Sequence, residues 1–218
     1  MQLVPSTPSI HIEEGFGIGY GSPLATCGGA TTLTAGTHFL LARNGRGKTT
    51  LLRTIARSLK PTSGAFKATG FLQYLPEDLC FDPEITPDMI FKMLIPRARF
   101  QEAAALARDI ELDVKKSYGK LSTGNRRKTS LIMAEFSIRP DQGNILLLDE
   151  PFSGLDAFAR QTFEEIWRKS SSNVLRLVSC HPDYDSMRMP SALLIEGKHI
   201  THHSSQEQTW SSLKNLLN

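Results

Sequence analysis

Asn44-Gly45-Arg46-Gly47-Lys48-Thr49-Thr50 is a glycine-rich turn that runs into Lys-Thr just after the apolar run Phe39-Leu40-Leu41. Glycines let the backbone turn so that successive N–H groups point at one anion. Lys48 can then reach the outer phosphates, and the Thr49 hydroxyl can ligate Mg²⁺. The stretch therefore predicts a loop that binds a nucleoside triphosphate. Because Gly-Lys-Thr strings also arise by chance, and Ala42 stands where such loops usually have their first glycine, the prediction needs support from elsewhere in the chain.

The size and composition of the chain indicate a globular α/β protein. Its 218 residues suit one α/β domain with a sizeable core and at most a smaller subdomain. Hydrophobic residues make up 40% and charged residues 22%, and no apolar run is long enough to cross a bilayer. A role at a membrane would therefore require a partner. The net charge of +3 comes without long basic blocks, so direct nucleic-acid binding is not expected.

The start of the chain and its cysteines favour a cytoplasmic location. Met1 to Pro5 lacks the basic-then-apolar order of a signal peptide. Three scattered cysteines, Cys27, Cys80 and Cys180, suggest free thiols in a reducing compartment.

Hydrophobic periodicity predicts strands and helices in alternation. Residues 9–43 are β-rich pieces separated by glycine turns, and about 50 residues before Asn125 are rich in helix formers, which predicts a helical insertion. The continuous apolar runs 145–148 and 174–179 are typical of parallel strands buried on both faces. The remaining expected elements are a strand at 71–75, helices at 49–59 and 157–169, a hairpin at 192–200, and an amphipathic helix at 205–217 with Trp210, Leu213, Leu216 and Leu217 inward.

Two adjacent carboxylates, Asp149 and Glu150, follow the apolar run 145–148. The carboxyl ends of strands are where α/β sheets present their ligand groups. Asp149 could hold the water shell of Mg²⁺, and Glu150 could polarise the water that attacks the terminal phosphate. The alternative is a strand-end pair that faces solvent.

Leu121-Ser122-Thr123-Gly124-Asn125 closely resembles the Leu-Ser-Gly-Gly-Gln signature of ATP-binding cassette (ABC) ATPases. The resemblance spans almost the whole chain. Residues 151–156 look like the family's D-loop, and His181 ends the next strand like its switch histidine. It implies an α/β fold: a P-loop NTPase core with a mainly parallel sheet, an antiparallel β subdomain near adenine, and an inserted α-helical subdomain at about 78–137. Residues 1–218 would form a single nucleotide-binding domain.

The resemblance also assigns roles to residues. Tyr20 would stack on adenine, and Asn44, Gly45, Arg46, Gly47, Lys48, Thr49 and Thr50 would bind the ATP phosphates. Thr49, Asp149 and Glu77 would serve Mg²⁺, while Glu150 activates water and His181 positions it. Ser122, Thr123, Gly124, Asn125 and Asp156 would lie across the interface of an ATP-closed dimer, with a second copy or a homologous subunit.

Some of these residues have structural alternatives. Tyr20 lies in a glycine-rich turn and could merely cover surface, and most isolated histidines are structural or exposed. Ser122 is a good helix N-cap. The three cations that follow, Arg126-Arg127-Lys128, conflict with the helix dipole unless something negative is near. A phosphate would relieve that conflict, and a solvated basic patch is the alternative.

Four positions depart from the family pattern. Alanine in place of glycine at position 42 should have a mild effect on the loop if the φ of Ala42 is negative. Thr123 and Asn125 keep the polar character of the signature. Glu77 stands where the family has the Q-loop glutamine, which predicts a tighter Mg²⁺ dependence or an altered turnover. A shifted register would make Gln73 the sensor instead.

The resulting functional hypothesis is an ATP-hydrolysing subunit that powers transport of an unknown substrate through a separate membrane permease. It would be cytoplasmic and peripheral on the inner face of the membrane. The alternative is a soluble ABC ATPase that acts on a macromolecular partner such as the ribosome or DNA. A third possibility, raised by the four departures, is an ATP-binding regulatory subunit with little hydrolysis.

Overall fold

The computed structural model describes residues 7–170, 172–181 and 185–217. The expectation about a signal peptide concerns Met1 to Pro5, which lie outside these residues. The helices of the described part are α1 (Lys48–Ile55), α2 (Pro87–Leu94), α3 (Arg97–Asp109), the 3-10 helix η1 (Tyr118–Lys120), α4 (Thr123–Phe136), α5 (Ala157–Lys169) and α6 (Trp210–Lys214).

The strands form two sheets. They are β1 (Ser9–Ile12), β2 (Gly17–Tyr20), β3 (Ser22–Cys27), β4 (Thr31–Leu33), β5 (Gly36–Ala42), β6 (Phe66–Thr69), β7 (Phe71–Leu75), β8 (Asn144–Leu148), β9 (Val174–Ser179), β10 (Ser191–Glu196) and β11 (His199–Ser204). The larger sheet has the order β2-β3-β11-β10-β5-β9-β8-β7, and its run from β10 to β7 is parallel throughout. The smaller sheet, β4-β1-β6, is antiparallel. The predicted fold class is confirmed.

The parallel strands are buried on both faces, as their continuous apolar runs predict. In β8, Leu146 and Leu148 belong to one hydrophobic cluster, whereas Ile145 and Leu147 belong to a second one. The same alternation holds in β5, β9 and β10. Successive side chains point to opposite faces of a sheet, so each run serves two cores.

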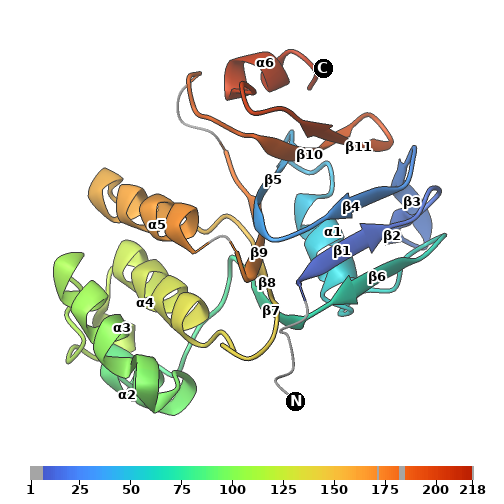
Figure 1. Ribbon diagram of the computed structural model, residues 1–218. Coiled ribbons are helices and arrows are strands. Elements are labelled where there is room, and N and C mark those ends of the chain that lie inside the picture. The colour runs from blue at the N-terminus through green and yellow to red at the C-terminus, as the bar shows by residue number, and fades with distance from the viewer. Residues whose placement is uncertain (1–6, 171, 182–184, 218) are drawn as a thin grey trace.

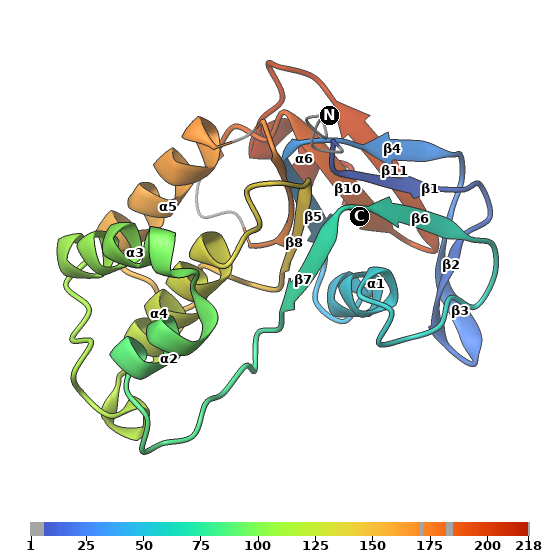
Figure 2. The ribbon, with the colours of Figure 1, turned by 60° about the horizontal axis from the view of Figure 1, so that its bottom comes forward.

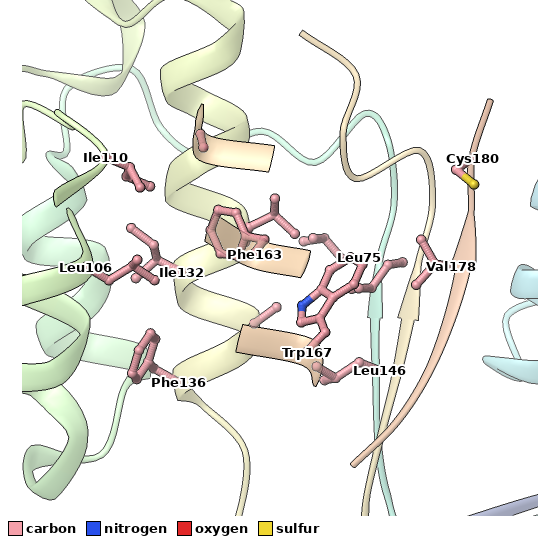
Figure 3. Close-up of a cluster of buried hydrophobic side chains, with 14 of the residues drawn as sticks. Leu75, Leu106, Ile110, Ile132, Phe136, Leu146, Phe163, Trp167, Val178 and Cys180 are labelled. Carbon is pink, nitrogen blue, oxygen red and sulfur yellow. The ribbon is translucent and has the colours of Figure 1, made fainter. Parts of the chain in front are cut away.

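The two cores lie on opposite sides of the large sheet. Helices α2, α3, α4 and α5 gather on one side of it, and α1 lies on the other side with the small sheet β4-β1-β6 (Figures 1 and 2). Figure 3 shows the first core, in which Ile132 of α4 lies beside Leu106 of α3, and Phe163 and Trp167 of α5 lie between α4 and the strands that carry Leu75 and Leu146. The helical insertion therefore shares a core with the strands that carry the candidate carboxylates.

The C-terminal segment differs from the sequence prediction. Its helix spans only Trp210–Lys214, and Leu216 is 40% exposed rather than inward. The backbone between residues 205 and 210 is bonded to another segment: Ser205 N–H donates to the Pro190 carbonyl, and Trp210 N–H donates to the Met187 carbonyl. These bonds compete with helix formation, which the apolar spacing does not reveal.

The first helix is also shorter than predicted. It ends at Ile55 rather than near residue 59, and Arg57 just beyond it has a φ of 62° in the left-handed region. A left-handed residue is a common way for a helix to end. Within the described residues, no helix combines the length and apolarity needed to cross a bilayer.

Candidate active site

The glycine-rich turn joins β5 to α1. Gly45 and Gly47 have φ of 74° and 107°, which side chains with a Cβ rarely adopt. A Cβ on Gly47 would also lie 2.9 Å from Leu24 Cδ2. Ala42 is the last residue of β5 and has no positive φ, so its methyl group is tolerated where the family has glycine. The sequence predicts a mild effect from Ala42 on the condition that its φ is negative, and the structure meets this condition.

A cavity of about 440 Å³ lies over this turn. Most of the predicted phosphate-site residues line it, together with two residues that sequence reasoning missed, Arg43 and Ser153. The full lining is Arg43, Asn44, Gly45, Gly47, Lys48, Thr49, Thr50, Glu77, Glu150, Ser153 and His181. Arg46 is not among them and is exposed. One cavity thus brings together three parts that are far apart in the sequence: the glycine-rich turn, Glu150 and His181.

Three charged or titratable groups meet inside it. Lys48 Nζ lies 3.4 Å from Glu150 Oε1 and 3.3 Å from His181 Nε2, and it donates to the Ala42 carbonyl at 3.3 Å. His181 Nε2 is itself 3.4 Å from Glu150 Oε1. This oxygen is shielded from solvent but accepts no hydrogen bond. A buried carboxylate oxygen without a hydrogen bond is poised to accept one from a bound group.

Asp149 is 1% exposed and is not among the residues that line the cavity. Its Oδ1 accepts a hydrogen bond from Ser179 Oγ at 2.7 Å, and its Oδ2 accepts one from the Tyr74 hydroxyl at 3.3 Å. Burial, together with the negative charge of Asp149, raises the pKa of Tyr74 to about 12, so this phenol stays a hydrogen-bond donor. The alternative of a solvent-facing pair is therefore wrong for Asp149.

Tyr20 lies at the end of β2, is 65% exposed, and is not among the residues that line the cavity. Its phenol neighbours Arg53 of α1: hydrogen bonding first to Tyr74 and then to Tyr20 raises the pKa of the Arg53 guanidinium. The exposed ring is free to stack on a planar group, and its role toward adenine stays a prediction.

The residue at the Q-loop position is Glu77, two residues beyond the end of β7. It lines the cavity, whereas Gln73 lies inside β7 and accepts a hydrogen bond from Ser137 Oγ at 2.9 Å. The geometry therefore favours Glu77, rather than Gln73, as the residue at the Q-loop position.

The signature segment begins α4. Ser122 is the N-cap, as predicted, and accepts a hydrogen bond from Asn125 N–H at 3.2 Å. A Cβ on Gly124 would lie 2.5 Å from the Gly154 carbonyl oxygen, so this glycine allows the start of α4 to touch the segment that precedes α5. Ser122, Thr123, Gly124 and Asn125 do not line the 440 Å³ cavity of their own chain.

The cations after the signature bind groups of this chain. Arg127 donates to the Glu77 carbonyl at 2.8 Å, and Lys128 Nζ donates to the Ile110 carbonyl at 2.9 Å. Both side chains are buried, so the solvated-patch interpretation is wrong for them. Carbonyl oxygens, and for Lys128 also the Asp156 carboxylate, supply the negative groups that these cations need near the start of the helix.

Asp156 is the N-cap of α5, accepting from Ala159 N–H at 2.8 Å, and its Oδ2 lies 2.7 Å from Lys128 Nζ. Lys128 first, and then the Ala159 N–H, lower the pKa of this carboxyl. Its expected place at a dimer interface stays a prediction.

The oxygen groups in the cavity fit Mg²⁺ that is bound together with phosphates. Among the described residues, no group of three or more His, Cys, Asp or Glu could hold a metal by itself. Mg²⁺ keeps several waters and usually takes one or two carboxylates plus substrate phosphates. The Thr49 hydroxyl and the Glu77 carboxylate, both lining the cavity, match that requirement.

The fold and the cavity define a P-loop protein with a nucleotide-type site. The model of the family described as "ABC transporter" matches residues 31–153, more than half of the chain. The chain belongs to this family.

Individual relatives agree with this assignment. The chain is 38% identical over 130 residues to the ATP-binding protein Uup of Caulobacter vibrioides and 33% identical over 135 residues to the ABC transporter ATP-binding protein YtrB of Bacillus subtilis. These matches cover 58% and 56% of this chain but only 20% and 45% of the relatives. A bacterial Atm1-family ABC exporter solved with ATP bound shares the fold over 98% of this chain and 41% of its own, with a TM-score of 0.75 at 19% identity.

Proposed function

We propose that this chain binds ATP with Mg²⁺, hydrolyses it, and thereby powers transport through a separate membrane permease. The observation that carries the proposal is the meeting of Lys48, Glu150 and His181 in one cavity over the glycine turn. A phosphate-binding cation, a carboxylate and an imidazole at one point are the parts that phosphoryl transfer to water requires.

The turn and Lys48 bind the phosphates. Helix α1 begins at Lys48, and its first residues line the cavity, where the helix dipole and the N-terminal N–H groups favour an anion. Lys48 now contacts the Ala42 carbonyl and Glu150, and a terminal phosphate offers it a stronger, doubly charged partner. When Lys48 moves to the phosphate, Glu150 loses its neighbouring cation and becomes a better proton acceptor.

Glu150 and His181 then act on the attacking water. The free Oε1 of Glu150 accepts a proton from that water, and His181 Nε2, 3.4 Å from the same oxygen, lies within reach of the same water. Mg²⁺, held by Thr49 and Glu77 with Asp149 near its water shell, would neutralise charge on the phosphates.

A dimer would complete the site. Ser122 and Gly124 lie outside the cavity of their own chain, which supports a role toward a nucleotide held by another subunit. The partner would be a second copy or a homologous ABC subunit, and the assembly would sit on the cytoplasmic face of the membrane through the permease.

A second candidate function is that of a soluble ABC ATPase that acts on a macromolecular partner. It is supported by a relative whose name says only that it is an ATP-binding protein. Purification of the tagged chain from detergent-solubilised membranes decides between the two. Transport predicts an integral membrane protein in stoichiometric amount, and its absence together with a ribosomal or DNA-bound partner favours the second function.

The ATPase claim is tested on the purified chain by phosphate release from ATP. Release should require Mg²⁺ and rise more than linearly with protein concentration, because two chains complete each site. Binding of ATP without release would favour the regulatory subunit instead.

A further inference from the structure

Ser179 is the last residue of β9, two residues before His181, and it is fully buried. Its hydroxyl joins the two candidate carboxylate residues. Oγ donates to Asp149 Oδ1 at 2.7 Å and accepts from the backbone N–H of Glu150 at 2.9 Å. A hydroxyl has one proton to donate, and a backbone N–H can only donate, so both directions are fixed.

The backbone of Glu150 needs such a bond. Its φ is 45°, in the left-handed region that residues with a Cβ avoid. Pro151 follows it, and the residue before a proline prefers an extended backbone. Glu150 is thus held in an unfavourable conformation, and the bond from its N–H to Ser179 is a direct restraint on it.

This conformation directs the Glu150 carboxylate into the cavity. Its Oε1 lies 3.4 Å from both Lys48 Nζ and His181 Nε2, whereas the preceding residue, Asp149, is buried and does not line the cavity. Both residues follow the end of β8 at Leu148, and the left-handed backbone of Glu150 interrupts the alternation that adjacent residues of a strand would show.

We propose that Ser179 is a positioning residue that aligns Asp149 and Glu150 together, which rests on the proposed function. Through Oγ–H it fixes the carboxylate near the Mg²⁺ position, and through its lone pair it fixes the residue that accepts the proton. Tyr74 holds only the other oxygen of Asp149 and has no bond to Glu150. Ser179 therefore affects both the metal and the proton-transfer step, whereas Tyr74 affects the metal alone.

The test compares Ser179→Ala, Ser179→Thr and Tyr74→Phe with a matched control, Ser137→Ala. Ser137 Oγ likewise lies within hydrogen-bond distance of two groups, Gln73 Oε1 at 2.9 Å and the Met133 carbonyl at 2.7 Å, which share its single proton, and Ser137 does not line the cavity. For each variant we would measure the thermal midpoint, kcat and KM for ATP, and the Mg²⁺ concentration that half-saturates binding of a fluorescent ATP analogue.

Ser179→Ala should lower kcat about tenfold or more and change KM for ATP less than about twofold, since reacting groups move while the phosphate loop stays intact. It should also raise the half-saturating Mg²⁺ concentration. Ser179→Thr keeps the hydroxyl and should restore most of kcat, and Tyr74→Phe should shift the Mg²⁺ dependence with a smaller loss of kcat. Ser137→Ala should leave both unchanged even if its thermal midpoint falls.

Equal kcat losses in Ser179→Ala and Ser137→Ala would overturn the proposal, because the effect would then be one of stability. If the parent chain binds but does not hydrolyse ATP, the proposed hydrolysis fails, and the Mg²⁺ dependence of nucleotide binding still decides the alignment of Asp149. An unchanged dependence in Ser179→Ala would then refute it.

Discussion

Lys48 and Glu150 contact each other directly in the cavity, with 3.4 Å between Nζ and Oε1. The cation at the start of α1 and the carboxylate that follows β8 therefore form a pair in this structure. A phosphate that enters this cavity competes with Glu150 for Lys48. In the proposed mechanism, this competition links nucleotide binding to the release of the Glu150 carboxylate, which then accepts the proton from water.

Lys48→Ala should weaken ATP binding about 10- to 100-fold, because a charge-assisted hydrogen bond to phosphate is lost. Equilibrium titration with a fluorescent ATP analogue measures this. Arg46→Ala is the matched control, since Arg46 belongs to the same turn but lies outside the cavity. Equal affinity losses in the two variants would contradict the assigned role of Lys48.

Gly124→Ala should destabilise the fold by about 1–3 kcal/mol, because its Cβ would lie 2.5 Å from the Gly154 carbonyl. Gly28→Ala is the control: Gly28 has no positive φ, and a Cβ there meets nothing within 4 Å, so its effect should stay within about 0.5 kcal/mol. Urea unfolding of both variants gives the comparison. A Gly124→Ala variant as stable as the parent would show that the start of α4 and the segment around Gly154 can move apart without cost.

Arg176→Met should destabilise the fold by about 3–5 kcal/mol, since it leaves the buried Glu135 carboxylate without its partner. Arg176 is fully buried, and its Nη2 lies 2.6 Å from Glu135 Oε2. The double variant Glu135→Leu/Arg176→Met should recover most of that stability, because the apolar pair removes both charges. Denaturant midpoints test this, and a double variant less stable than Arg176→Met would be the contrary result.

Stability should fall as the pH drops below about 6.5, because His38 and His202 are held neutral. His38 Nε2 donates to the Thr34 carbonyl, so its Nδ1 accepts from Ser191 Oγ at 2.7 Å. Ser191 Oγ in turn accepts from His202 Nε2 at 2.8 Å. Burial lowers the pKa of both imidazoles, and His203 further lowers that of His202.

The sign of the effect follows from these shifts. Above about pH 6.5 neither the folded nor the unfolded chain binds these protons. Below it the unfolded chain takes them up first, and stability declines until the lower folded-state pKa values are reached. Urea unfolding at pH 7.5 and 5.5 measures the loss, and His38→Asn should reduce it. A loss of the same size in His38→Asn would assign the pH dependence to other groups.

Much of this architecture could be predicted from the sequence because its signals are local. The glycine turn before Lys48 and the apolar run before Asp149 can each be recognised from their own residues. The large sheet, which contains the strand before the turn and the apolar run itself, brings the two segments together. The buried pair of Glu135 and Arg176 could not be predicted, because its partners are 41 residues apart and Arg176 stands in an apolar strand. Long-range pairing also overrode the helical spacing after Ser205.

Ser179 is an intermediate case. Side-chain alternation places it on the face of β9 that also carries Leu175 and Leu177, where a buried hydroxyl requires a partner. The pattern could have singled it out, but its bonds to Asp149 and Glu150 depend on the strand order β9-β8.

The most direct test of the central claim is single-turnover hydrolysis of ATP by Glu150→Gln in the presence of Mg²⁺. The amide keeps the shape of the side chain but cannot accept the proton from water. ATP affinity should stay within about twofold, or rise as Lys48 loses its competing partner, while hydrolysis slows about 100-fold or more. Hydrolysis at the parent rate in a variant that binds ATP normally would contradict the assignment of Glu150 as the base.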